Sequence, residues 1–341
     1  EPNVRSFWRK VGRHNSEEFA EEYAALVKVT TSAMLKAAPD CFVMAGSVSN
    51  YWEPSYQWTE SCFKQGILKT GIRGWSVHPY GVKTPEEFAV GHRRMRELLE
   101  QYDAPDTPLL NTERGFAVKE TYEGWSGGSK ERSREFQAWN FVRQYMIDQL
   151  CDVRLTVWYQ WDGEEFGLVD QGGSRPVYGA CREMFEQLND YRVVRRIDSD
   201  TELDYVLLFE NEDGDRKLVA WTAPPPGGAP DEAKPHHAAI HTSKSLAAAD
   251  PAGKPAENEV AVNPIRVTLT GAPQYIPVPA DVELKKCVPL GPVSLAQEAS
   301  SPRTPETPAR AVDLKLFEKG AEWEFIKNTG EGSFTLGEAQ D

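Results

Sequence analysis

The chain has 341 residues, of which 40% are hydrophobic and 26% are charged, an ordinary balance for a globular protein with room for two or three domains. Its net charge of −14 and its pI of about 5.1 argue against nucleic acid as a partner, which usually requires a basic face, and against an anionic membrane surface. No apolar stretch approaches the roughly 20 residues that a membrane span needs.

From residue 1 to residue 188, helical periodicity alternates with short apolar runs. The first helix is expected to begin at Asn15, with Glu18 as its capping-box partner. Further helices are expected at residues 56–69, from Thr84, around residues 136–145 and at residues 176–188, and strands at residues 42–46, 74–80, 109–112 and 155–161. Strands that alternate with helices imply a parallel sheet. With a strand end at Glu1, these units predict an α/β fold in residues 1–188, the C-terminal half of a (β/α)8 TIM barrel.

The periodicity changes near residue 189. Residues 205–209 and 217–221 flank a polar turn and predict a β-hairpin. Residues 223–258 are rich in Pro, Ala and Gly and predict a long loop, and further strands are expected at residues 265–271 and 274–278. We therefore interpret residues 189–290 as an all-β sandwich domain, residues 291–312 as a Pro/Ser/Thr/Ala-rich linker and residues 313–341 as the start of a truncated third β module.

Cysteine and histidine give weak signals for a metal site. The five cysteines are odd in number, widely spaced and without a Cys-x-x-Cys pair, which favours buried free thiols and leaves one disulfide open. His237 and His241 have a four-residue spacing and follow His236, but their Pro/Ala-rich segment brings no ordered carboxylates. We therefore expect no metal site there.

Two glutamates stand where strands are expected to end. Glu1 precedes Pro2, and a residue before proline is held in extended geometry. Glu113 follows the strand that starts at residue 109 and precedes Arg114, a candidate ion-pair partner. Carboxylates at the C-terminal ends of parallel barrel strands are typical of catalytic groups, and a carboxylate pair is what a retaining glycosidase uses. A frayed terminal Glu1 and an ordinary surface Glu113 are the structural alternatives.

Polar and aromatic side chains are expected around these glutamates. His78 and Tyr80 end the strand before Glu113 and can donate hydrogen bonds to it or to a sugar hydroxyl. Trp158 and Trp161 are expected at the end of the last strand, where an indole face can stack on a pyranose. They point to opposite sides of a strand, so at most one is expected to face the site. Three loop tryptophans are candidate sugar platforms as a group, with core packing as the alternative: Trp52, Trp58 and Trp125.

Four segments, in this order, resemble motifs of the clan A glycoside hydrolases, in particular family 39 and its relatives. Residues 1–3 (Glu-Pro-Asn) resemble the end of the Asn-Glu-Pro motif after the fourth barrel strand, and residues 76–81 (Ser-Val-His-Pro-Tyr-Gly) resemble the sixth-strand motif. Residues 112–115 (Thr-Glu-Arg-Gly) resemble the seventh-strand nucleophile motif, and residues 158–162 (Trp-Tyr-Gln-Trp-Asp) resemble the eighth strand. The resemblance covers roughly residues 1–280.

This resemblance implies that Glu1 is the acid/base and Glu113 the nucleophile. It places His78 and Tyr80 beside Glu113 and assigns substrate contacts to the following residues: Trp158, Trp161, Asn3 and Trp52. The family pattern also has an Asn before the acid/base and an Arg on an earlier strand, both outside this chain. Because the chain starts inside a motif and without Met, we expect an N-terminally truncated fragment that is inactive alone.

The expected function is therefore hydrolysis of β-linked oligo- or polysaccharides by double displacement, without a cofactor. The acid should then have a raised pKa. One alternative is a non-catalytic carbohydrate-binding protein with a degenerate barrel. Another is a metal-dependent hydrolase, which predicts a cluster of histidine and carboxylates at the strand ends. A secreted or periplasmic location is compatible with the sequence, and the sugar, the linkage and the oligomeric state stay open.

Overall fold

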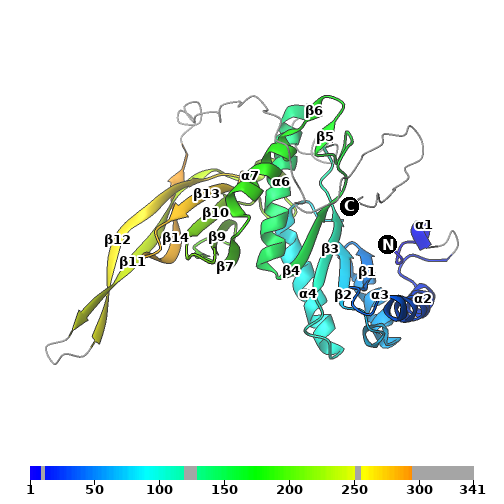
Figure 1. Ribbon diagram of the computed structural model, residues 1–341. Helices are drawn as coiled ribbons and strands as arrows, with labels where there is room; N and C mark the ends of the chain where they lie inside the picture. Colours follow the sequence, from blue (N-terminus) through cyan, green and yellow to red (C-terminus); the bar gives the residue numbers. More distant parts are fainter. Residues whose placement is uncertain (9–11, 119–128, 250–254, 294–341) are drawn as a thin grey trace, which may run out of the picture. The chain divides into compact units, whose positions relative to one another are not determined.

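The computed structural model describes residues 1–8, 12–118, 129–249 and 255–293 (Figure 1). Residues 1–293 belong to one compact unit. The predicted platform Trp125, nearly all of the predicted linker at residues 291–312 and the predicted third module at residues 313–341 lie outside the described residues. None of the helices in the described part is long and apolar enough to cross a membrane.

A four-stranded parallel sheet forms the first part of this unit (Figure 1). Its strands are neighbours in sequence order: β1 (Met44–Ser49), β2 (Gly74–His78), β3 (Leu109–Arg114) and β4 (Val153–Trp158). The helical elements are α1 (Arg5–Trp8), α2 (Glu17–Ala37), α3 (Glu53–Lys64), η1 (Ile67–Lys69), η2 (Pro85–Glu87), α4 (Phe88–Gln101), α6 (Lys130–Leu150) and α7 (Pro176–Leu188). This order confirms the predicted alternation of strands and helices in an α/β fold.

Helices α2, α3 and α4 cover one face of this sheet. Phe19 of α2, Trp58 of α3 and Leu99 of α4 are buried in one cluster with Val48 of β1 and Trp75 of β2. Burial of such large apolar side chains is the main driving force for this packing, at roughly 25 cal/mol per Å². Trp58 is only 1% exposed, because the amphipathic helix α3 turns it inward, so the prediction that it is a sugar platform is wrong.

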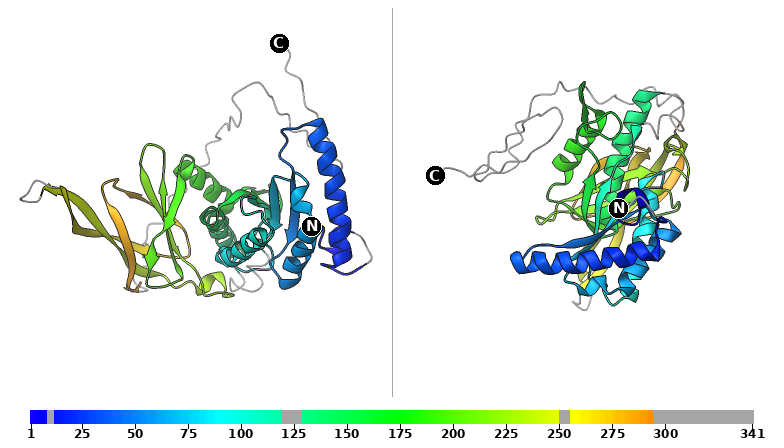
Figure 2. Two further views of the ribbon diagram at one scale, coloured as in Figure 1. Left: turned by 90° about the horizontal axis from the view of Figure 1, so that it is seen from below. Right: turned by 90° about the vertical axis from the view of Figure 1, so that its right-hand side faces the viewer.

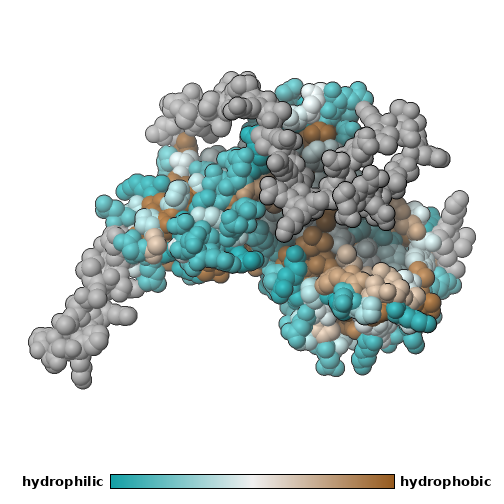
Figure 3. All heavy atoms as spheres, viewed as in Figure 1, coloured by the Kyte–Doolittle hydropathy of each residue, from teal (hydrophilic) through white to brown (hydrophobic). Residues whose placement is uncertain are grey.

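Among the described residues, the opposite face of the sheet is partly exposed at β4. Leu155 and Val157 of β4 are 41% and 40% exposed, and they alternate with Thr156 and Trp158, which face the helices. Hydrophobic residues also gather over these strands in Figure 3. Within the described residues, β1 and β4 each have a sheet neighbour on one side only. Within the described part of the chain, this face of β4 is therefore only partly covered.

A β-bulge shapes β1 near its carboxyl end. The pairing of β1 with β2 shifts register between Ala45 and Val48, which places an extra residue in β1. Gly46 lies in this bulge with a φ of +104°, and a Cβ on it would lie 2.4 Å from the carbonyl oxygen of Ser76. Only glycine fits this backbone, because another residue would meet both the strained φ and the neighbouring strand.

Several predicted boundaries differ from the structure. Ser16, and not Asn15, is the N-cap of α2, and its side chain accepts a hydrogen bond from the first turn. Asn15 instead adopts a left-handed backbone with φ of 55°, which asparagine tolerates. Strand β4 ends at Trp158, so Trp161 lies in the loop after the strand and not at its end.

The second part of the unit consists of two four-stranded sheets. In order, the first contains β13 (Gln274–Val278), β10 (Arg216–Thr222), β9 (Asp204–Glu210) and β7 (Arg192–Arg196), and the second contains β12 (Pro255–Leu269), β11 (His236–Ala249), β14 (Glu283–Pro292) and β8 (Asp198–Ser199). The short strands β5 (Val169–Asp170) and β6 (Gly173–Ser174) pair in the loop after β4, and η3 spans Pro230–Glu232. Strands β9 and β10 form the predicted hairpin.

The predicted loop at residues 223–258 is wrong, because β11 and the start of β12 lie within it. The Pro/Ala/Gly composition has a weak strand propensity, which the paired backbone of this long hairpin overrides. Side chains from both sheets, among them Leu208, Leu218, Ile240 and Leu284, form one buried cluster. The two sheets therefore share a core.

The core also crosses the predicted domain boundary near residue 189. Tyr205 and Phe209 of β9 and Trp221 of β10 are buried in one cluster with Phe141 and Met146 of α6. The β sheets are therefore packed onto the helices of the first part and not carried on a flexible linker.

A buried ion pair reinforces this contact. Arg143 of α6 donates from Nε to Glu86 Oε1 at 2.6 Å and from Nη2 to Glu86 Oε2 at 2.5 Å. Trp221 of β10 donates its indole N–H to Glu86 Oε1 at 2.7 Å. The Arg143 side chain is fully buried and that of Glu86 is 8% exposed. A bidentate pair of this kind fixes the geometry of the three elements that it joins.

A second buried network lies between the sheet and α6. Asp148 is fully buried and accepts hydrogen bonds from Asn111 Nδ2 of β3 and Thr156 Oγ1 of β4, each at 2.8 Å. His92 Nε2 of α4 lies 2.8 Å from the other carboxylate oxygen, and His92 Nδ1 lies 2.6 Å from the Tyr51 hydroxyl. Burial raises the pKa of Tyr51, which keeps this hydroxyl protonated as a donor to His92.

Replacement of Asp148 by Asn is expected to destabilise the fold by about 1–3 kcal/mol. The NH2 group of the introduced Asn can donate a hydrogen bond but cannot accept one. At least one buried donor that now bonds to the Asp148 carboxylate would therefore lose its partner. Urea unfolding followed by tryptophan fluorescence measures the change. Substitution of the exposed Asp103 by Asn is the control, and an Asp148→Asn protein as stable as this control would contradict the role of the network.

Candidate active site

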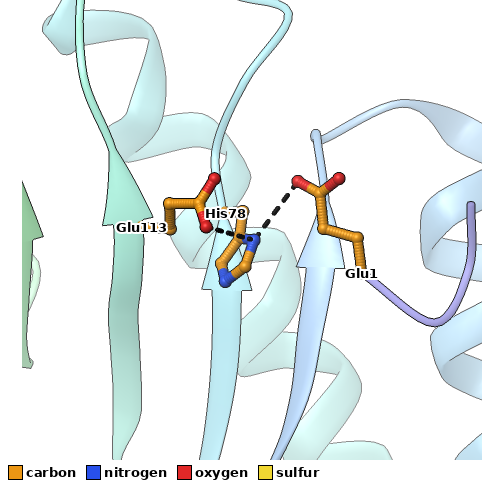
Figure 4. Close-up of side chains that lie close together, drawn as sticks. All are labelled: Glu1, His78 and Glu113. Atoms are coloured by element: carbon orange, nitrogen blue, oxygen red, sulfur yellow. Dashed lines mark hydrogen bonds and ion pairs between the residues drawn. The ribbon is translucent and has the colours of Figure 1, made fainter. Parts of the chain in front are cut away.

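Three titratable side chains meet at the carboxyl ends of the parallel strands. Figure 4 shows His78, at the end of β2, between Glu1 and Glu113. His78 Nδ1 lies 3.2 Å from Glu1 Oε1 and 4.0 Å from Glu113 Oε2. The side chains of His78 and Glu1 are 8% and 13% exposed, whereas that of Glu113 is 34% exposed. The structure therefore brings together the two glutamates and the histidine that the sequence singled out.

Asn3 fixes the N-terminal segment that carries Glu1. Its side chain accepts from the backbone N–H of Ser49 at 3.0 Å and donates to the carbonyl of Ser49 at 3.2 Å. Asn3 Nδ2 also donates to Asn15 Oδ1 at 2.9 Å. Asn3 is fully buried. It therefore holds the chain against the end of β1, and it exposes no surface for the predicted substrate contact.

The pKa of Glu1 is lowered from its ordinary value. Burial is the largest influence and would raise this pKa, but the hydrogen bond and charge of His78 act in the other direction. Ser49 and the terminal ammonium group lower it further. This lowered pKa of Glu1 is opposite to the raised pKa that we expected of a catalytic acid. The contact with His78 causes the difference, and the sequence does not reveal that contact.

A β-bulge in β3 directs Glu113. The pairing of β3 with β4 shifts register between Asn111 and Arg114, so an extra residue lies in β3 in the segment that contains Glu113. Bulges turn side chains out of the regular alternation and are common beside functional sites. Tyr80 donates its hydroxyl to Glu113 Oε1 at 3.2 Å. Burial, followed by the charge of Glu113, raises the pKa of Tyr80, so the hydroxyl stays protonated and donates.

Arg114 packs against the ring of Tyr80. Its side chain is 1% exposed, and its guanidinium carbon lies 4.7 Å from the ring centroid of Tyr80 and 3.9 Å from that of Phe116. Such cation–π contacts are worth about 2 kcal/mol when desolvated. Arg114 therefore orients the tyrosine that holds Glu113.

The other predicted platforms lie in different settings. Trp158 is half-buried, donates its indole N–H to the carbonyl of Phe166 at 2.7 Å and packs on Phe141 with ring centroids 5.0 Å apart. Trp161 is 60% exposed. Trp52 is 59% exposed, and a Cβ added at Gly81 would lie 2.7 Å from its Nε1. Trp52 therefore packs beside the loop that follows Tyr80, with much of its ring open to solvent.

Three hydroxyl groups next to His78 were not predicted from the sequence. Thr112, Ser76 and Ser47 come from β3, β2 and β1 and lie in hydrogen-bond contact in that order. Thr112 Oγ1 lies 3.1 Å from His78 Nε2. Small polar residues inside strands of apolar neighbours are a signal for such a polar interior, and this signal was present in the sequence.

The glutamates and His78 are also the one group with metal-ligand chemistry among the described residues. One ligand atom from each lies within 4.8 Å of the others. The histidines of β11 do not form such a group: His236 Nε2 lies 3.1 Å from Asp204 Oδ2, and His237 Nδ1 lies 3.0 Å from Thr268 Oγ1. All five cysteines are free thiols, as predicted, but only Cys62 and Cys287 are buried, and the other three are partly exposed.

Comparison with known proteins gives a likeness in fold. No protein-family model matches the chain, and no curated protein matches it in sequence. A glucosidase from Croceicoccus marinus is 15% identical over 81% of this chain and 67% of that chain, with a TM-score of 0.51. An endo-β1,6-glucanase is 14% identical over 76% of this chain and 53% of that chain, with a TM-score of 0.44. The GH51 arabinofuranosidase from Xanthomonas axonopodis pv. citri is 14% identical over 82% of this chain and 64% of that chain, with a TM-score of 0.43.

At 15% identity and a TM-score of 0.51, the likeness to the Croceicoccus marinus glucosidase shows the fold alone. The chain spans between about half and two thirds of the length of these three solved structures. The α/β part with its appended β sheets therefore resembles that glucosidase in fold.

Proposed function

We propose that this protein is a retaining glycosidase that hydrolyses β-linked oligo- or polysaccharides. The observation that supports this most is the pair of glutamates at the carboxyl ends of the parallel strands, with His78 between them. One carboxylate oxygen of Glu1 lies within 4.8 Å of one of Glu113. Retaining enzymes hold their carboxyl groups about 5–5.5 Å apart, whereas inverting enzymes leave room for a water, at about 6.5–9.5 Å.

In the proposed reaction, Glu113 is the nucleophile and Glu1 is the acid/base. Glu113 attacks the sugar carbon while Glu1 protonates the leaving oxygen, and Glu1 then removes a proton from the water that releases the sugar. Burial is already the largest influence on the pKa of Glu1. A bound sugar that displaces water strengthens this influence and raises the pKa of Glu1 toward the range that an acid needs.

We further propose that the parallel sheet is the C-terminal half of a (β/α)8 barrel of the clan A type, related to family 39, and that the β region is a sandwich. Two observations on the described residues support this: Leu155 and Val157 are exposed on the inner face of β4, and β1 and β4 each pair on one side only. Four more strands would close such a barrel and would supply the rest of the substrate cleft. The predicted inactivity of this chain alone stays a prediction, so turnover and covalent label are measured with the barrel that these four strands complete.

Incubation with a 2-fluoro β-glycoside, followed by peptide mass spectrometry, tests the proposal. Covalent label is expected on Glu113, and NMR of the first product is expected to show the β anomer. Label on another residue, or an α product, would overturn the assigned nucleophile. If β-aryl glycosides give neither turnover nor label while glycans still bind, the non-catalytic carbohydrate-binding alternative is favoured.

The cluster of His78 with the two glutamates also favours a second candidate function, that of a metal-dependent hydrolase. However, a metal at about 2.1 Å from each ligand needs ligand atoms roughly 3.4 Å apart, so these side chains would have to move closer. Dialysis against EDTA separates the two functions. Unchanged turnover after chelation supports the glycosidase, and loss that zinc restores supports the metal enzyme.

A further inference from the structure

A chain of hydroxyl groups leads from His78 into the interior of the parallel sheet. Thr112 Oγ1 lies 3.1 Å from His78 Nε2 and is in close hydrogen-bond contact with Ser76 Oγ. Ser47 Oγ donates to Ser76 Oγ at 3.5 Å. The ring nitrogen of His78 that faces away from the glutamates is therefore partnered by a hydroxyl group.

The protonation states along this chain follow from the donors and acceptors. Glu1 is ionised near neutral pH because its pKa is lowered, and an ionised carboxylate only accepts hydrogen bonds. The nitrogen of His78 at 3.2 Å from Glu1 must then carry a proton. A neutral imidazole has one N–H, so Nε2 accepts, and Thr112 has to donate to it.

We propose that Thr112 is a positioning residue, which donates its hydroxyl proton to Nε2 of His78 and, together with Glu1, holds the imidazole proton on Nδ1, between Glu1 and Glu113. The hydrogen bond at one ring nitrogen of a histidine determines which of the two nitrogens carries the proton. Ser76 supports Thr112, because its own hydroxyl can donate to Thr112 Oγ1 once that group has turned its proton toward His78.

A hydroxyl at this place has a property that a carboxylate or a carbonyl lacks. Those groups only accept, so they would draw the imidazole proton to Nε2 and would turn the lone pair of Nδ1 toward the glutamates. A threonine hydroxyl rotates, so it donates to neutral His78 and accepts from the imidazolium. The consequence for catalysis rests on the proposed function, whereas the tautomer is a property of the unliganded protein.

Long-range ¹H–¹⁵N NMR of the full chain, at a pH where the imidazoles are neutral, measures the tautomer directly. The signals of His78 are identified by their loss in His78→Gln. We expect Nδ1 to be protonated and Nε2 to be unprotonated. A His78 with its proton on Nε2 would overturn the inference, and this measurement needs no variant of Thr112.

Variants at Thr112 give the second test. Thr112→Val keeps the shape and removes the hydroxyl, and we expect its His78 shifts to move to values of mixed tautomers, whereas Thr112→Ser should restore those of the parent. Unchanged shifts in a folded Thr112→Val protein would contradict the inference. Should this variant not fold, Ser76→Ala removes the next hydroxyl and is expected to move the same signals less.

Kinetics separate this inference from the proposed function. If the protein turns over β-aryl glycosides, Thr112→Val should lower kcat/KM about fivefold, the value of one hydrogen bond, and Thr112→Ser should recover it. The expected tautomer in a protein without turnover would overturn the proposed function and leave the inference standing. Turnover by a protein whose His78 carries its proton on Nε2 would overturn the inference and leave the proposed function standing.

Discussion

Replacement of Glu113 by Gln is expected to lower kcat for a β-aryl glycoside about 10,000-fold, with the fold intact. Glutamine keeps the shape of the side chain, and its amide oxygen can still accept the hydrogen bond that Tyr80 donates to Glu113 Oε1 at 3.2 Å. An amide cannot attack the sugar carbon as a carboxylate does, so the covalent step is lost while the pocket is preserved.

The measurement is the initial rate with an activated aryl glycoside, with circular dichroism to check folding. Glu100→Gln is the matched control, because Glu100 is an exposed glutamate on α4, and its rate should equal that of the parent. In Glu113→Ala, added azide should restore turnover and yield the α-glycosyl azide. A Glu113→Gln protein within tenfold of the parent would remove Glu113 from the role of nucleophile.

The sequence predicted the parallel sheet well because its signals are local. Residues 74–78 and 109–112 are short segments with buried apolar residues, among them Trp75, Val77 and Leu109, and both form adjacent strands of the sheet. The end of each strand is also a local property, which is why His78 and Glu113 were expected at the same edge. Parallel strands that are neighbours in space then bring these residues together without further information.

Other features depend on contacts that a sequence does not show. The pKa of Glu1 is set by His78, which is 77 residues away, and the sign of the shift follows from that contact. Trp58 has the flat aromatic side chain that a sugar platform needs, yet the face of α3 on which it lies packs against the sheet. Strands β11 and β12 form from a segment of loop-like composition because each pairs with the other.

Substitution of Arg143 by Met is expected to destabilise the fold by about 3–5 kcal/mol, the usual cost of an uncompensated buried charge. Arg143 makes two hydrogen bonds to Glu86, and its side chain is fully buried. Without it, the Glu86 carboxylate would keep the indole N–H of Trp221 but would lose its counter-ion. The contact between α6 and β10 should weaken with it, because Glu86 joins the two.

Urea unfolding at pH 7 measures this loss, and Arg182→Met is the matched control. Arg182 lies on α7 in an exposed pair with Glu186, which is worth about 0.3–0.5 kcal/mol. In the double variant Glu86→Leu/Arg143→Met, no buried charge remains, so much of the stability should return. A single variant no less stable than the control would show that the pair contributes nothing to the fold.

The pH dependence of the same variant gives an independent check with a defined sign. Burial would raise the pKa of Glu86, but the charge and hydrogen bonds of Arg143, followed by Trp221, hold it below its ordinary value of 4.5. The folded protein therefore releases this proton more readily than the unfolded chain, so the pair stabilises the fold above about pH 4.5 and loses this effect as the pH falls through the folded pKa. The parent should approach the stability of Arg143→Met as the pH falls through the folded pKa of Glu86, and a constant difference down to the acid transition would assign the effect of Arg143 to packing and not to charge.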